Sequence, residues 1–192
     1  MIKSSSLRFF KALIVSAVYR WAWPSHASVA EMVYLSLPLE VQENLDLDMM
    51  IDGSNDPDQE FKDTAAHHYP NSCKTALRWL DEGKCSYEDG DYGHASYCFG
   101  VFTHCVADSF AAPHCVGKES GKDHHNFETV ADDLTPQITY LHGDLDSHMR
   151  KGFEKGKSNW EKWKKTHDKS IIQSELDMGA SAAYSAIKNA LK

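Results

Sequence analysis

The feature that most constrains this chain is a polar pair inside an apolar run. Residues 97–110, YCFGVFTHCVADSF, are largely apolar yet carry His104 and Asp108. A spacing of four residues places both side chains on one face of a helix, one turn apart. Burying an imidazole and a carboxylate without partners is expensive, and a divalent cation removes that cost. Pro113 cannot continue a helix, so we expect the chain to turn there and return His114 to the same face.

Other stretches offer further potential metal ligands. Eleven histidines is a high number for 192 residues, and most of them lie between His67 and His125. Neutral imidazole and carboxylate are common zinc ligands, and each stretch alone would be weak evidence for a metal site. Their concentration is what favours one. The candidates are His26; Asp56, Asp58, His67 and His68; His104, Asp108 and His114; and His124, His125 and Glu128.

Net charge and cysteine content disfavour some classes of binding partner and metal site. The formal net charge of -8 disfavours broad binding to a nucleic acid backbone, which requires a basic surface. Bound divalent cations would cancel much of this negative charge. The five cysteines include no C-x-x-C pair, which disfavours a thiolate zinc site. We expect buried or disulfide-linked cysteines, and Cys73 and Cys85 could pair.

The start of the chain has the order of a secretory signal, with basic residues followed by an apolar run. That run, over 12–19, is too short to span a bilayer. We therefore expect a signal peptide or N-terminal extension over 1–20, one domain over 21–192, and a secreted or extracytoplasmic protein. Cleavage before Trp21 would place a tryptophan at the mature N-terminus, and Trp23 is the alternative.

Beyond residue 20 apolar residues recur at the intervals of amphipathic helices, and strand signals are weak. This pattern predicts an all-α fold, a single helical-bundle domain whose facing helices build a site in the interior. One expected helix closes at Gly83, and another is interrupted at Pro136 and Gly143. The expected helices lie in residues 28–37, 73–83, 90–110, 127–156 and 174–192.

Several motifs together resemble the zinc-dependent phospholipase C family and the related single-strand-specific zinc nucleases. The N-terminal WAWPSHASVA is closer to the nuclease branch. The central helix of the family is matched even at Gly100, one turn before His104. The matching stretches are GSNDPD at 53–58, HHY at 67–69, DYGHASYCFGVFTHCVADSFAAPH at 91–114 and HHNFE at 124–128.

The resemblance implies an all-α fold with three zinc ions (Zn²⁺) lining a cleft. It also implies that Asp58 acts as general base. The interval between Asp58 and His68 is shorter than in the family, so Asp56 remains a competing ligand. By motif, the first zinc is held by Asp58, His68, His104 and Asp108, the second by His114, His124 and Glu128, and the third by His26, a bridging Asp108 and the amino and carbonyl groups of Trp21.

Three functions follow, in order of preference. The first is a zinc-dependent phosphodiester hydrolase of the phospholipase C type, acting on a phospholipid or another phosphodiester, with peripheral membrane contact through the C-terminal helix as a possibility. The second is a single-strand-specific nuclease or nucleotidase, which would show exposed aromatic side chains beside the metals. The third is a non-catalytic zinc-binding protein. Tyr69 and Phe127 are aromatic candidates for the cleft, and core packing explains them equally well.

Overall fold

The computed structural model describes residues 24–61, 67–117 and 121–192, and within these ranges it contains helices and no strand. The all-α prediction is confirmed. The proposed signal segment, Trp21 and Trp23 lie outside the described residues. The helices are α2 (Pro24–Ser36), α3 (Leu39–Gln42), α4 (Leu47–Asp56), α5 (Asn71–Glu88), α6 (Tyr92–Asp108), α7 (Gly121–Ala131), α8 (Leu145–Thr166) and α9 (Lys169–Ala190), with a short π-helical turn η1 (Pro57–Phe61) and a 3₁₀ turn η3 (Ala112–Cys115).

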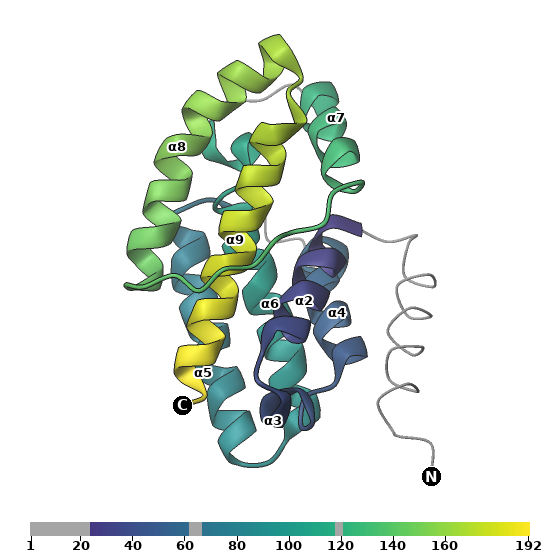
Figure 1. Cartoon of the computed structure of the whole chain (residues 1–192), viewed down its shortest axis with the longest axis vertical. Helices are drawn as coiled ribbons and strands as arrows, with labels where there is room; N and C mark the ends of the chain where they lie inside the picture. The colour runs from purple at the N-terminus through teal and green to yellow at the C-terminus, as the bar shows by residue number, and fades with distance from the viewer. Residues whose placement is uncertain (1–23, 62–66, 118–120) are drawn as a thin grey trace.

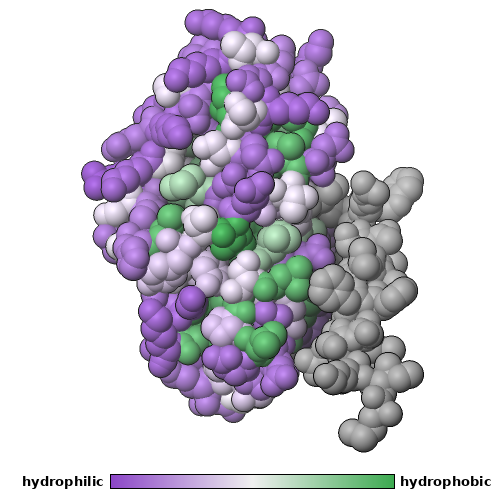
Figure 2. Space-filling model, in the orientation of Figure 1, coloured by the Kyte–Doolittle hydropathy of each residue, from purple (hydrophilic) through white to green (hydrophobic). Residues whose placement is uncertain are grey.

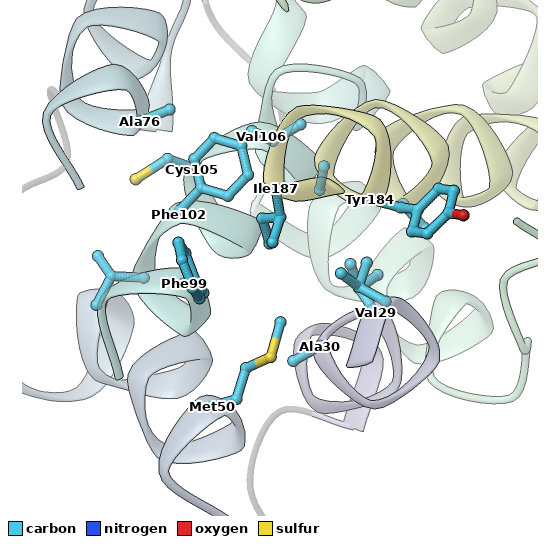
Figure 3. Packing of buried hydrophobic residues seen from close by; sticks show 14 of the residues in the cluster. Val29, Ala30, Met50, Ala76, Phe99, Phe102, Cys105, Val106, Tyr184 and Ile187 are labelled. Carbon is cyan, nitrogen blue, oxygen red and sulfur yellow. The ribbon is translucent and has the colours of Figure 1, made fainter. Parts of the chain in front are cut away.

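The apolar helix α6 forms the centre of the fold and packs against α2, α4, α5 and α9. Its length from Tyr92 to Asp108 matches the predicted apolar helix closely. Side chains from these neighbours meet between the helices in a fully buried core (Figure 3). The core there includes Val29 of α2, Met50 of α4, Phe99 and Phe102 of α6, and Ile187 of α9.

Helices α4 and α6 touch backbone to backbone because each has a glycine at the crossing. A Cβ at Gly100 would overlap the carbonyl oxygen of Met50, and one at Gly53 would overlap that of Tyr97. Only glycine permits such an approach. The crossing lies one turn before His104 and therefore brings the end of α4 against that histidine.

The segment between α7 and α8 corrects one expectation. Residues 132–144 were expected to be helical with breaks, but Asp132 and Asp133 form a turn after α7 and the chain then crosses α9 in an extended form (Figure 1). Alternate backbone N–H groups donate to side chains one turn apart on α9, which fixes the extended form. These bonds join Gln137 to Asp177 at 2.8 Å, Thr139 to Ser181 at 3.0 Å and Leu141 to Ser185 at 2.8 Å.

Helix α5 gives a second correction, since it does not end at Gly83 but continues to Glu88. A Cβ at Gly83 would lie 2.7 Å from the Phe99 ring, so this glycine allows close contact with α6 and does not mark a helix end. Of the two states expected for the cysteines, buried or disulfide-linked, the structure shows the first. Cys73 and Cys85 do not form a disulfide with each other, and all five cysteines except Cys85 are buried.

Hydrophilic side chains cover most of the face shown in Figure 2, where apolar groups form small separate patches. Within the described ranges, no helix combines the length and hydrophobicity needed to cross a bilayer.

Candidate metal centre

The carboxylate of Asp108 lies at the centre of a group of histidines. Its Oδ2 lies 2.5 Å from His67 Nδ1 and 3.1 Å from His104 Nε2. Its Oδ1 lies 3.5 Å from His26 Nε2 and 3.7 Å from His114 Nε2. Asp108 is almost fully buried, with 2% of its side chain exposed. One buried carboxylate thus meets imidazoles from four separate parts of the chain, and each of its oxygens faces two of them.

The ring of His104 shows why this group suits a cation. Its Nδ1 lies 2.9 Å from the carbonyl oxygen of Ser54, which can only accept a hydrogen bond. A neutral His104 therefore carries its proton on Nδ1 and turns the lone pair of Nε2 toward Asp108. A lone pair and a carboxylate oxygen 3.1 Å apart repel unless a proton or a metal cation lies between them. A ring held by a backbone carbonyl on its far side is also the usual arrangement of a metal-bound histidine.

Asp58 of η1 joins the same group from the solvent side. Its Oδ1 lies 3.7 Å from His67 Nε2 and 3.9 Å from His104 Nε2, and its Oδ2 lies 3.9 Å from His26 Nε2. The competing candidate Asp56 points elsewhere and accepts a 2.8 Å hydrogen bond from the Tyr97 hydroxyl. The geometry therefore favours Asp58 over Asp56 as a ligand.

The two adjacent histidines lie differently from what the motif indicates. His67, not His68, reaches Asp58, His104 and Asp108. The Nδ1 of His68 instead donates to the carbonyl oxygen of His114 at 2.7 Å. His68 thus holds the backbone of His114 in place.

A second set of ligand atoms adjoins the first. His114 of η3 lies against His124 of α7, with ring centroids 4.9 Å apart, and His124 Nε2 lies 2.9 Å from Glu128 Oε1. The turn at Pro113 brings His114 back to Asp108, as the sequence predicts. His125, the neighbour of His124, is exposed. Of these two neighbours, His124 is therefore the one that joins the second set, as the motif indicates.

Ligand atoms converge in three groups here, each with its atoms within 4.8 Å of one another. Zinc binds nitrogen and oxygen ligands at about 2.0–2.2 Å, so these spacings are close to those of ligands that share one ion. The first two groups share His104, and Asp108 of the first group also contacts His67 of the second. The groups are His26, His104 and Asp108; Asp58, His67 and His104; and His114, His124 and Glu128.

The electrostatics of the group favour the protonation state that binds metal. Burial lowers the pKa of His26 to about 3 and that of His114 to about 4, so both rings stay neutral. Burial alone would raise the pKa of Asp108, but His104 and the other imidazoles hold it well below its usual value. Neutral rings at His26 and His114 beside an ionised Asp108 can bind a divalent cation without losing protons.

A cavity of about 250 Å³ opens beside these groups. Its lining includes His26, Asp108, His114 and Glu128 together with the apolar side chains of Val29, Phe127, Ile172 and Leu176. Phe127 is buried against Trp160 and Trp163, so it serves both the cavity wall and the core. The Tyr69 hydroxyl, the other aromatic candidate, donates to Asp146 at 3.0 Å.

Sequence reasoning missed Glu175 of α9, a buried carboxyl that lines the cavity. It accepts hydrogen bonds from the backbone N–H of Ala112 at 3.1 Å and from Asn159 Nδ2 at 2.8 Å. Burial raises its pKa to about 7. Through its two hydrogen bonds, Glu175 connects α9 both to α8 and to the turn that carries His114. An acidic residue on the apolar face shared with Ile172 and Gly179 was the available signal.

Comparison with known proteins agrees with this geometry. The family model described as zinc dependent phospholipase C matches residues 25–185, which cover most of the chain and include every group of ligand atoms described above. No curated protein and no solved structure matches the chain.

Proposed function

Because the chain belongs to the zinc-dependent phospholipase C family, we propose that it hydrolyses phospholipids at the phosphodiester bond on the glycerol side. The observation that carries this proposal is the buried Asp108 carboxylate between four imidazoles. Such a group is costly unless cations occupy it. Phosphodiester hydrolysis at clustered cations is the chemistry that it supports best.

We propose three zinc ions. When bound, they would lower the pKa of a water molecule and neutralise the charge of the substrate phosphate. Asp108 would bridge two of them, and His67 takes the place that the motif gives to His68. The first ion would be held by Asp58, His67, His104 and Asp108, the second by His114, His124 and Glu128, and the third by His26, Asp108 and the main chain of Trp21.

Asp58 is the residue proposed to move the proton. It is the more exposed carboxylate of its group, with 21% of its side chain accessible against 2% for Asp108. Burial raises its pKa, which makes it a better proton acceptor than an ordinary aspartate. In the reaction, the oxygen of water forms a bond to phosphorus and a water proton passes to Asp58. The bond from phosphorus to the glycerol oxygen breaks, and that oxygen takes up a proton.

The cavity supports a phosphate ester with an apolar part as the substrate. Its lining combines members of the ligand groups with apolar side chains that include Phe127, Ile172 and Leu176. A volume of about 250 Å³ accommodates the phosphate and the carbon atoms next to it. The acyl chains would then remain outside, where the lipid surface lies. Peripheral membrane contact and export, which depends on residues 1–20, are part of this proposal.

A nuclease or nucleotidase is the second candidate. The N-terminal stretch WAWPSHASVA favours it, because its spacing of tryptophan and histidine is closer to the nuclease branch. The net charge of -8 disfavours it, because an acidic protein repels a nucleic acid backbone.

The test compares substrates and a matched pair of variants. The zinc-loaded protein should release diacylglycerol from mixed micelles of phosphatidylcholine or phosphatidylethanolamine and should leave single-stranded DNA and RNA intact. Asp58→Asn should lower kcat at least about 100-fold, in the range of lost general-base catalysis. Asp56→Asn, two residues away and outside the group, should retain activity. Hydrolysis of nucleic acid without hydrolysis of lipid would overturn the proposal in favour of the second candidate.

A further inference from the structure

Away from the metal centre, a further set of ligand-type side chains meets on the surface between α5 and α6. Glu82 comes from α5, and His94 and Cys98 lie one turn apart at the start of α6. His94 Nε2 lies 3.0 Å from Glu82 Oε1 and 3.5 Å from Cys98 Sγ. Glu82 and His94 are nearly half exposed, whereas Cys98 is fully buried.

These spacings are those of ligands around one tetrahedral zinc ion. With Zn–S of about 2.3 Å and Zn–N and Zn–O of about 2.0–2.1 Å, tetrahedral angles place nitrogen about 3.6 Å from sulfur and about 3.3 Å from oxygen. The observed distances are 3.5 Å and 3.0 Å. All three ligand atoms lie within 4.8 Å of one another.

Hydrogen bonding alone does not satisfy the same arrangement. One ring nitrogen of His94 faces both the carboxylate of Glu82 and the thiol of Cys98. If its N–H donates to the carboxylate, the sulfur is left as at most a weak second acceptor. A plain ion pair between Glu82 and His94 would not require the thiol to lie beside the same nitrogen. A cation between the three atoms satisfies all of them together.

The helices hold these ligands rigidly. Gly83, next to Glu82, lies where α5 and α6 come closest, because a Cβ there would be 3.2 Å from the Cβ of Cys98 and 2.7 Å from the Phe99 ring. The backbone N–H of His94 donates to Asp91 Oδ1 at 3.2 Å, which fixes the first turn of α6. Ligands on packed helices keep their geometry better than ligands on loops.

We propose that Glu82, His94 and Cys98 form a second, structural site for a zinc-type divalent cation, which ties α5 to α6. His94 and His104 are ten residues apart on the same helix, which places this site about 15 Å from the proposed hydrolytic centre. The exposed side chains leave one coordination position to water. The site does not depend on the proposed function, because none of its ligands lines the cavity.

Binding at this site displaces one proton. Burial and the neighbouring carboxylates of Glu82 and Asp91 raise the pKa of Cys98 to about 12, so the thiol is protonated without a cation. The cation forms a bond to sulfur, and the thiol proton leaves to solvent. The bound cation then lies between the negative charges of the Glu82 carboxylate and the Cys98 thiolate.

The test uses cobalt as a spectroscopic substitute for zinc. Cobalt bound through sulfur gives an intense near-ultraviolet charge-transfer band, whereas cobalt held by imidazole and carboxylate does not. None of the proposed ligands of the hydrolytic centre is a cysteine, so this band would report the second site alone. Protein produced in zinc-depleted, cobalt-supplemented medium should show the band. Cys98→Ala should lose it, and Cys85→Ala, which alters the exposed free cysteine of α5, should keep it.

A second pair of variants guards against misfolding of Cys98→Ala. His94→Gln and Glu82→Gln change exposed side chains and should weaken the band at least tenfold at equal cobalt concentration while leaving the far-ultraviolet circular dichroism unchanged. The proposal is overturned if the wild-type protein carries cobalt at its hydrolytic centre but shows no band. It is equally overturned if the band persists in folded Cys98→Ala or in His94→Gln, or disappears in Cys85→Ala.

Discussion

At the scale of single residues, the site depends on how Asp108 uses both carboxylate oxygens. Oδ1 faces His26 and His114, and Oδ2 faces His67 and His104. A carboxylate that bridges two cations would face its neighbours in this way. The role of His104 depends on a bond on the far side of its ring, from Nδ1 to the Ser54 carbonyl oxygen.

Asp108→Ala should therefore remove two zinc ions per molecule rather than one, because both would share this carboxylate. Elemental analysis of the purified variant measures the loss directly. Asp56→Asn is the control and should retain the full zinc content, since Asp56 bonds only to Tyr97 among the described contacts of its carboxylate. Loss of a single zinc ion from Asp108→Ala would show that Asp108 does not bridge.

The two adjacent histidines give a second prediction. His67→Ala should lower zinc affinity more than about 100-fold, because it removes a ligand-type nitrogen 2.5 Å from Asp108. His68→Ala should cost roughly 10-fold, because it removes only a hydrogen bond to the His114 carbonyl. Competition with a metal indicator dye measures both affinities. A larger loss in His68→Ala than in His67→Ala would restore the assignment made from the motif.

Glu175 gives a pH-dependent prediction. Its pKa is about 7 in the folded protein against 4.5 for an ordinary glutamate, mainly because it is buried. Below pH 4.5 it is protonated in both states. Between pH 4.5 and 7 it ionises only in the unfolded state, so its contribution to stability is lost as pH rises, by about 3 kcal/mol in total.

Glu175→Gln removes this titration. The unfolding free energy of the variant minus that of the wild type should therefore increase by about that amount between pH 4.5 and pH 8. Measuring both proteins in the same metal-loaded buffers cancels the pH dependence of metal binding, which they share. A difference that does not change with pH would mean that Glu175 ionises normally.

At the scale of helices, the crossing of α4 and α6 positions the centre. Gly53 and Gly100 allow the two backbones to touch, and the last turn of α4 then meets His104. The sequence predicts α6 well, because its apolar run is long and His104 and Asp108 fall on one face. It does not reveal that the helices touch at Gly53, because that contact depends on two distant segments.

Gly100→Ala should destabilise the protein by about 3 kcal/mol or more, because the new methyl group would overlap the backbone of α4 at Met50. Urea unfolding measures this loss. Gly93→Ala on the same helix is the matched control, since its Cβ would meet nothing within 4 Å. That variant should be neutral or slightly stabilised. Equal effects of the two substitutions would argue against the close crossing.

Helix ends and connections were less predictable than helices. Gly83 resembled a helix end but lies in the middle of α5, where it faces Phe99. Residues 132–144 carry apolar groups at helical spacing, yet bonds to Asp177, Ser181 and Ser185 hold them extended. Side chains one turn apart on another helix supply these partners, and a local pattern does not show them.

At the scale of the whole molecule, the motifs indicate most of the side chains that converge in the candidate metal centre. His26, Asp58, His104, Asp108, His114, His124 and Glu128 converge in the structure as the motifs indicate. The motif does not distinguish His67 from His68 by position alone, because the two are adjacent; in the structure His67 is the one that lies within reach of Asp58 and Asp108. The role of Glu175 was missed because it depends on the contact of α9 with η3.

The central claim is that cations hold distant imidazoles and acids together inside the helical fold. The most direct test is the thermal unfolding midpoint of the purified protein with and without a zinc chelator. The midpoint should fall on chelation and recover when zinc is added, because a ligand bound only to the folded state stabilises it. A protein that contains no zinc and unfolds at the same temperature with and without chelator would contradict the claim.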